Sequence, residues 1–178
     1  KAVPKVRLTS QAKPIATMVL IGINVAVFLL GVLVDAQDAM GQYNPLAEDW
    51  GLIGNVPVAG GTYPGLGVAE GEWVRIVTGA FLHAGPFHLL MNMLALWLLG
   101  SQLERAMGWP RYLGLYVSSL FAGAFGVLLV DPTALTVGAS GAVFGLMGAA
   151  FALQKRRGGD PWAAGGGGLI LINPAFPF

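Results

Sequence analysis

The stretch "VGASGAVFGLMGAAFAL", residues 137–153, is almost wholly apolar and carries a single hydroxyl group, that of Ser140. Only glycine and alanine occupy the two positions on either side of this serine. The run approaches the roughly 20 apolar residues that a helix needs to cross a bilayer. Polar groups at such depth are costly and usually face the interior of a helical bundle. The surroundings of Ser140 therefore decide whether it serves packing or chemistry.

Three further apolar runs precede this one, at residues 15–34, 87–100 and 112–130. The second reaches spanning length only if it continues toward Met107, and a fifth run begins near Trp162. The chain is 55% hydrophobic and 11% charged, whereas soluble domains carry about 25% charged residues. We therefore expect an all-α, polytopic membrane protein, with a polar tail at residues 1–14 and a transmembrane domain of about five helices at residues 15–178.

Charged residues divide between alternate connections of this expected bundle. The connections after the first and third runs are predominantly acidic, and Arg75 is a lone basic residue in the first of them. The positive-inside rule then places the N-terminus and the basic connections in the cytoplasm. The basic residues concerned are Lys1, Lys5, Arg7, Lys13, Arg105, Arg111 and Lys155 to Arg157.

The connection at residues 35–86 is long, rich in glycine and proline, and partly apolar. Loops of this length in compact proteins are usually functional or disordered. Its apolar part, "WVRIVTGAFLH" at residues 73–83, argues against disorder. We expect short helices at or partly in the outer leaflet. The other connections are short, which predicts an up-down bundle.

Small residues recur every four positions in the third and fourth apolar runs, which favours close approach of these two helices. They are Gly114, Ser118, Ala122 and Gly126 in the third run, and Gly141, Gly145 and Ala149 in the fourth. Two polar residues elsewhere in the spans have structural interpretations. Asn24 is expected to bond to a neighbouring helix, and Glu104 to loop backbone at the cytoplasmic end.

The stretch "HAGPFHLLMN", residues 83–92, places His88 and Asn92 on one helical face because they are four positions apart. His83 lies just before a Gly-Pro pair that begins the helix. These groups are compatible with a metal site, a proton path, hydrogen bonds to an anion, or a purely structural pair. A metal would need a third strong ligand, and the chain has no cysteine.

The orientation puts Ser140 near the outer end of its helix, at the level of His88 and Asn92. Gly138 and Gly141 leave the backbone N–H groups at the helix start unobstructed, and these groups with the positive helix end suit a developing oxyanion. A serine hydroxyl is inert without a base. The alternative is a small serine that serves helix packing alone.

Together these residues resemble the rhomboid family of intramembrane serine proteases. Residues 138–141 match its G-x-S-G motif, and residues 83–92 match its H-x-x-x-x-H-x-x-x-N motif. Residues 100–108 match G-x-x-x-E-x-x-x-G, and "GEWVRIVTGAFLH" is similar to the Trp-Arg segment of its first loop, although Val74 separates Trp73 from Arg75. The resemblance extends from about residue 15 to the last residue.

The resemblance implies that Ser140 is the nucleophile. His88, Asn92 and the Ser140 N–H would then form the oxyanion hole. His83, Gly138, Gly141 and Arg75 would be supporting residues, and Glu104 would cap cytoplasmic loop structure. The implied partners are transmembrane protein substrates and the lipid bilayer, with no nucleic acid, metal or cofactor.

The chain departs from the family at the base, which is a histidine of a sixth core helix. Both of its histidines precede Ser140. We therefore expect a chain truncated before that helix and inactive as it stands, from a protease of a bacterial plasma membrane. An inactive relative that binds or routes transmembrane helices is the alternative. A transporter, suggested only by "NPA" at residues 173–175, is a third hypothesis.

Overall fold

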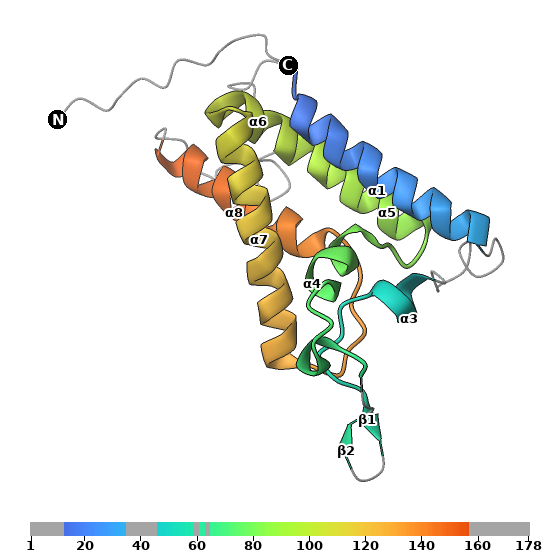
Figure 1. Ribbon diagram of the computed structural model, residues 1–178. Coiled ribbons are helices and arrows are strands. Elements are labelled where there is room, and N and C mark those ends of the chain that lie inside the picture. The colour runs from blue at the N-terminus through green and yellow to red at the C-terminus, as the bar shows by residue number, and fades with distance from the viewer. Residues whose placement is uncertain (1–12, 35–45, 59–60, 63–64, 157–178) are drawn as a thin grey trace.

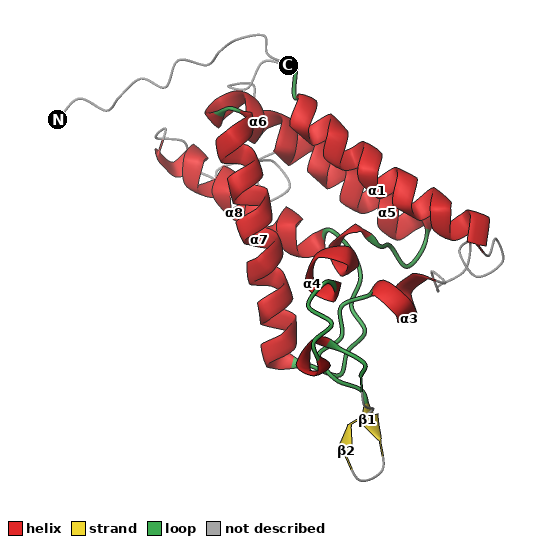
Figure 2. Ribbon diagram, viewed as in Figure 1, coloured by secondary structure: helices red, strands yellow, loops and turns green. Residues whose placement is uncertain are grey.

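The computed structural model describes residues 13–34, 46–58, 61–62 and 65–156 (Figure 1). The expected fifth run and most of the N-terminal tail lie outside these residues. The regular secondary structure of the described part is helical apart from an isolated bridge and a small hairpin, in which β1 (Pro57–Val58) pairs antiparallel with β2 (Gly61–Thr62) (Figure 2). The predicted all-α class is confirmed.

Four helical segments build the bundle: α1 (Ile15–Val34), α5 (Pro86–Ala95) continued by π-helix η3 (Leu96–Gly100) and α6 (Ser101–Met107), α7 (Trp109–Val130), and α8 (Ser140–Arg156). Among the described helices, α1 and α7 are each long and apolar enough to cross a membrane. Segments 75–81 and 86–107, bent by 94°, add a third candidate if taken as one span. The 17-residue α8 is shorter than α1 and α7.

Glycine and proline set the helix boundaries that differ from the sequence prediction. The second helix begins at Pro86, where the missing N–H of proline costs no helical hydrogen bond. Gly108, at φ 81°, turns the chain so that α7 begins at Trp109 and not at residue 112. The last described helix begins at Ser140 and not at residue 137, because Gly138 has φ 122° and is not helical.

Successive helices run in opposite directions, as predicted for an up-down bundle (Figure 1). The start of α1, the α6–α7 turn and the end of α8 share one end of the molecule. The α7–α8 connection and the described part of the long loop, residues 46–85, share the other, and we call this loop the outer loop region after the orientation that the sequence predicts. The bundle core contains large side chains that are almost fully buried, among them Leu96, Leu103, Tyr112, Tyr116 and Leu146.

The outer loop region folds into short helices, as predicted, and into the unpredicted hairpin. Its helices are α3 (Leu46–Trp50), the 3₁₀ turns η1 (Val68–Glu70) and η2 (Gly79–Phe81), and α4 (Arg75–Thr78). Leu52, Val68 and Ile76 form a second, smaller core against Ala124 of α7. Trp73 and Val74 are exposed, which suits a surface that contacts lipid.

The α7–α8 pair packs through small residues, but not through all of those that the sequence indicates. Gly141 and Gly145 of α8 lie against Gly123 and Ser119 of α7. The predicted α7 face is wrong at Gly114 and Gly126, because an added Cβ at either position would meet nothing within 4 Å. Four-residue recurrence locates a smooth helix surface, whereas contact depends on how the partner helix crosses it.

Candidate active site

Ser140 is the first residue of α8 and follows the connection at residues 131–139. The carbonyl of Ala139 accepts the first helical hydrogen bond, from Val143 N at 3.0 Å. Within the described part of the chain, the N–H groups of Ser140, Gly141 and Ala142 donate to no backbone carbonyl. This is the ordinary condition of an uncapped helix start, where the aligned peptide dipoles favour negative charge.

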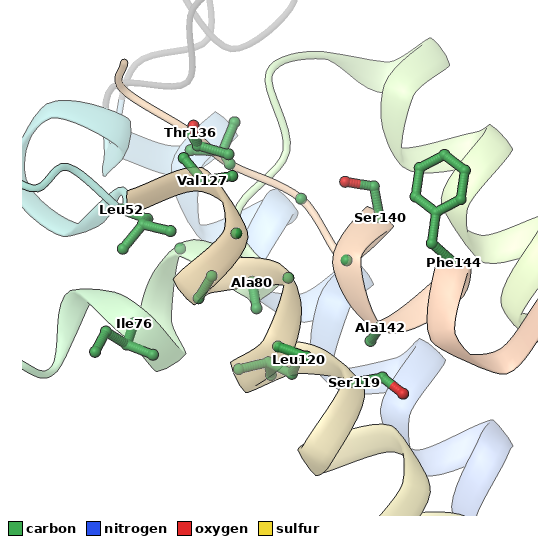
Figure 3. A pocket seen from close by; sticks show the side chains of 18 of the residues that line it. Leu52, Ile76, Ala80, Ser119, Leu120, Val127, Thr136, Ser140, Ala142 and Phe144 are labelled. Carbon is green, nitrogen blue, oxygen red and sulfur yellow. The ribbon is translucent and has the colours of Figure 1, made fainter. Parts of the chain in front are cut away.

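Ser140 borders a cavity of about 760 Å³ between α7, the start of α8 and the outer loop region (Figure 3). Ala80, Leu120 and Val127 contribute apolar wall. Polar side chains in the lining are few: Ser119, Asp131, Thr136 and Ser140 itself. The hydroxyl of Ser140 therefore borders a mostly apolar space that is large enough to receive part of another chain.

His88 packs against the backbone just before Ser140. A Cβ added at Gly138 would lie 2.8 Å from Cε1 and 3.0 Å from Nε2 of the His88 ring. Nδ1 of His88 accepts a hydrogen bond from Ala84 N at 3.4 Å. In the neutral ring the proton is then on Nε2, the nitrogen that faces Gly138, so that this edge of the ring is a donor. The absence of a side chain at residue 138 makes room for it.

Asn92 is buried one helical turn after His88, and its Nδ2 donates to the His88 carbonyl at 2.9 Å. Neither Asn92 nor His88 lines the cavity that Ser140 borders. The structure therefore joins His88 to the Gly138 backbone and Asn92 to His88. It records no hydrogen bond from any of these groups to the Ser140 hydroxyl.

His83 is fully buried, and its ring centroid lies 5.2 Å from that of His88. Burial, and to a lesser degree the nearby His88, lowers the pKa of His83 from 6.5 to about 4, although a backbone hydrogen bond with Phe81 opposes the shift. His83 is therefore neutral near pH 7. Within the described residues no three histidine or carboxylate side chains are grouped closely enough to hold a metal ion.

Backbone hydrogen bonds hold the connection before Ser140 against the outer loop region, and two of these contacts lie close to Ser140. Gly138 N donates to the Gly79 carbonyl at 2.9 Å. Leu52 and Thr136 exchange hydrogen bonds of 2.9 and 2.8 Å. The outer loop region thus clamps the segment that precedes Ser140. Backbone groups make both contacts, so that the residue types at these positions do not reveal them.

Arg75 organises the loop side of this clamp from a buried position. Its Nη1 donates to the carbonyls of Glu48 and Gly51, each at 2.9 Å, and its Nε donates to the Glu72 carboxylate at 2.6 Å. These bonds join α4 to the chain just before Leu52. Arg75 is therefore a structural support for the candidate site, and it does not line the cavity that Ser140 borders.

Glu104 lies at the opposite end of the bundle, where the sequence placed it, but its partners differ from those expected. Its carboxylate accepts hydrogen bonds from Ala16 N at 2.9 Å, Thr17 N at 2.8 Å and the Thr17 hydroxyl at 2.8 Å. It therefore caps the start of α1 and not a loop. Asn24 is buried and donates to the Leu20 carbonyl of its own helix at 2.7 Å.

Residues 70–164, just over half of the chain, match the family model described as Rhomboid domain. YdcA of Bacillus subtilis is 46% identical over 84 residues, which cover 47% of this chain and 42% of that protein. Rhomboid protease GluP of the same organism is 40% identical over 92 residues, or 51% of this chain and 18% of GluP. RHOMBOID-like protein 1 of Arabidopsis thaliana is 47% identical over 82 residues, or 46% of this chain and 21% of that protein.

The chain thus spans less than half the length of these relatives. Another relative, Rhomboid-like protease 5, comes from Toxoplasma gondii. Because bacteria, a plant and a protozoan all contribute similar proteins, the comparisons do not indicate a bacterial source.

Proposed function

The chain belongs to the rhomboid family, and from this premise we propose that it is the core of an intramembrane serine endopeptidase that cleaves transmembrane segments of membrane proteins. One observation carries the proposal. Ser140 stands at an uncapped helix start beside a cavity, and an imidazole packs against the preceding backbone. The names of two relatives from Bacillus subtilis also contain the words rhomboid protease.

In the proposed reaction the Ser140 oxygen attacks the carbonyl carbon of a substrate peptide bond. A base removes the hydroxyl proton and returns it to the leaving amine when the C–N bond breaks, and water then hydrolyses the acyl-enzyme. Before the C–N bond breaks, the substrate oxygen takes up the negative charge. The N–H groups at the start of α8 are available to it because they have no backbone acceptor. The Nε2–H of His88 and the second amide hydrogen of Asn92 are the side-chain donors that we assign to the same charge.

The proposed reaction also needs a general base, and neither histidine of this chain is assigned that role. His88 is assigned as a donor, with Nδ1 accepting from Ala84 N, and His83 is fully buried and does not line the cavity that Ser140 borders. We therefore propose that the reaction uses a histidine from outside these 178 residues. These residues alone would be inactive, because losing the base of a serine hydrolase costs about 10⁶-fold in rate.

We further propose that the end of the bundle bearing Lys13, Arg105 and Lys155 faces the cytoplasm, most simply that of a bacterial plasma membrane. Helix α3, which contains Glu48, and the end of α7, which Asp131 follows, lie toward the other end, so that the charge asymmetry follows the bundle axis (Figure 1). Ser140 then lies on the outer side. A helical substrate would have to unwind locally there to present a peptide bond.

The test is cleavage of a model transmembrane substrate by the full-length protein in proteoliposomes, with fluorophosphonate labelling of Ser140. We expect Ser140→Ala to abolish both. The matched control is Ser118→Ala, since Ser118 is an exposed serine of α7 whose hydroxyl bonds only within its own helix. Chelators should have no effect. Cleavage that survives Ser140→Ala would contradict the proposal, and substrate binding without cleavage would support the inactive relative instead.

A further inference from the structure

The backbone of α7 comes close to that of α8 at Gly123, which faces the residue that follows Ser140. An ideal Cβ at Gly123 would lie 2.7 Å from the Cα of Gly141 and 3.3 Å from its carbonyl carbon. Gly141 directly follows Ser140 in the chain. The reciprocal Cβ, added at Gly141, would lie 3.1 Å from the Cα of Gly123. Two glycines therefore face each other where the helices cross.

A methyl group at this contact would fit only if the backbone moved. The atoms that it meets belong to backbone, which cannot move aside by changing a rotamer. Real Cβ contacts below 3.0 Å are essentially absent from proteins. The start of α8 would therefore have to move away from α7 by several tenths of an ångström or more.

The segment on the other side of Ser140 is held and cannot follow this movement freely. Gly138 is bonded to the Gly79 carbonyl, and the His88 ring packs directly on it. Ser140 lies between this fixed point and Gly141. A shift at Gly141 alone would change where the Ser140 oxygen and the adjacent N–H groups stand relative to His88.

We infer that Gly123 is a positioning residue for Ser140: its missing side chain sets the depth at which α8 begins against α7, and thereby the alignment of the nucleophile with the oxyanion donors. This inference rests on the proposed hydrolase function. Gly123 touches neither the substrate bond nor the reacting atoms. It acts through the backbone of Gly141.

The chain offers a matched control in Gly114 of the same helix. An added Cβ there meets nothing within 4 Å, and the residue does not line the cavity. Replacing either glycine with alanine changes the intrinsic helix preference by the same amount, about 1 kcal/mol. Gly123, unlike Gly114, also lines the cavity, and a methyl group that only narrowed the cavity would raise KM. A loss of kcat in Gly123→Ala at unchanged KM, absent from Gly114→Ala, therefore reports the contact with Gly141.

The experiment measures kcat, KM and the rate of fluorophosphonate labelling of the full-length protein in proteoliposomes, with kcat expressed per labelled site. A displacement of about 1 Å at a reacting group can cost about 10²-fold in rate. We expect Gly123→Ala to lower kcat and the labelling rate by about that factor, with KM within twofold of wild type. Gly114→Ala should match wild type in all three.

Gly141→Ala is the second variant, for use if Gly123→Ala does not fold. Its milder 3.1 Å contact should produce a smaller loss of kcat with the same unchanged KM. Equal kcat values for the Gly123, Gly141 and Gly114 variants would overturn the inference, as would a raised KM with unchanged kcat. A wild-type protein that does not label at Ser140 would instead overturn the proposed function.

Discussion

The starts of α1 and α8 are built in opposite ways. At α1, the Glu104 carboxylate accepts hydrogen bonds from Ala16 N, Thr17 N and the Thr17 hydroxyl, so that the helix is capped from another segment. At α8, the first three N–H groups have no backbone acceptor in the described structure, and the residue before them is alanine. A helix start without partners is unfavourable unless water or a ligand occupies it. The start of α1 is therefore stabilised by side-chain hydrogen bonds, whereas the start of α8 leaves its N–H groups free of backbone acceptors within the described residues.

The largest effect should follow from closing the space beside the α8 start. Gly138→Ala puts a methyl group 2.8 Å from the His88 ring and forces alanine to φ 122°. We expect kcat for substrate cleavage by the full-length protein to fall about 10³-fold, comparable to losing an oxyanion donor. Loss of fluorophosphonate labelling should accompany it. Unchanged cleavage would mean that His88 need not face Gly138.

The capped end should respond in stability and not in catalysis. Glu104→Ala leaves three buried or partly buried donors without their acceptor, and we expect the free energy of unfolding to fall by about 4 kcal/mol. Glu104→Gln retains one acceptor oxygen and should lose about half as much. Denaturant unfolding in micelles measures this loss. A fall in kcat per labelled site would show that the two ends are not independent.

His83, whose ring lies beside that of His88, should make the free energy of unfolding depend on pH. Burial lowers its pKa from 6.5 to about 4, so that the unfolded chain binds more protons than the folded chain between these values. Stability is therefore complete above about pH 6.5 and decreases as the pH falls toward 4, by about 3 kcal/mol in total. Unfolding measured across this range should show the slope, and His83→Gln should reduce it. A wild-type profile that is flat between pH 4 and 6.5 would contradict the burial of a neutral His83.

Arg75→Lys should have the smallest effect of the four. Lysine retains the charge but lacks the planar fork that reaches Glu48 O, Gly51 O and the Glu72 carboxylate together. We expect a loss of about 2 kcal/mol in stability and a modest decrease in kcat, since the loop that clamps Thr136 and Gly138 is loosened. Faster hydrogen exchange at Leu52 and Gly138 is the direct readout. Unchanged hydrogen exchange at Leu52 and Gly138 would show that Arg75 does not stabilise these two backbone contacts.

Much of the architecture could be predicted because bilayer physics constrains the sequence strongly. Run lengths located the four bundle segments that the structure describes, and four-residue spacing put His88 and Asn92 on one face. The membrane orientation inferred from the charge distribution remains a prediction. The observed helix boundaries differ from the predicted ones at Pro86, Gly108 and Gly138. At these positions a single proline or glycine sets the boundary, whatever the hydropathy of the surrounding residues. The roles assigned to Ser140, His88 and Asn92 remain predictions.

By itself, the sequence determined a helical membrane bundle with one serine in a small-residue setting, because composition and local spacing are properties of a single segment. Only the tertiary structure decided that Gly123, and not Gly126, meets α8, that Glu104 caps α1, and that Gly79 and Leu52 hold the connection before Ser140. These contacts join segments far apart in the chain. They depend on how backbones fit and cross in space, which local pattern does not encode.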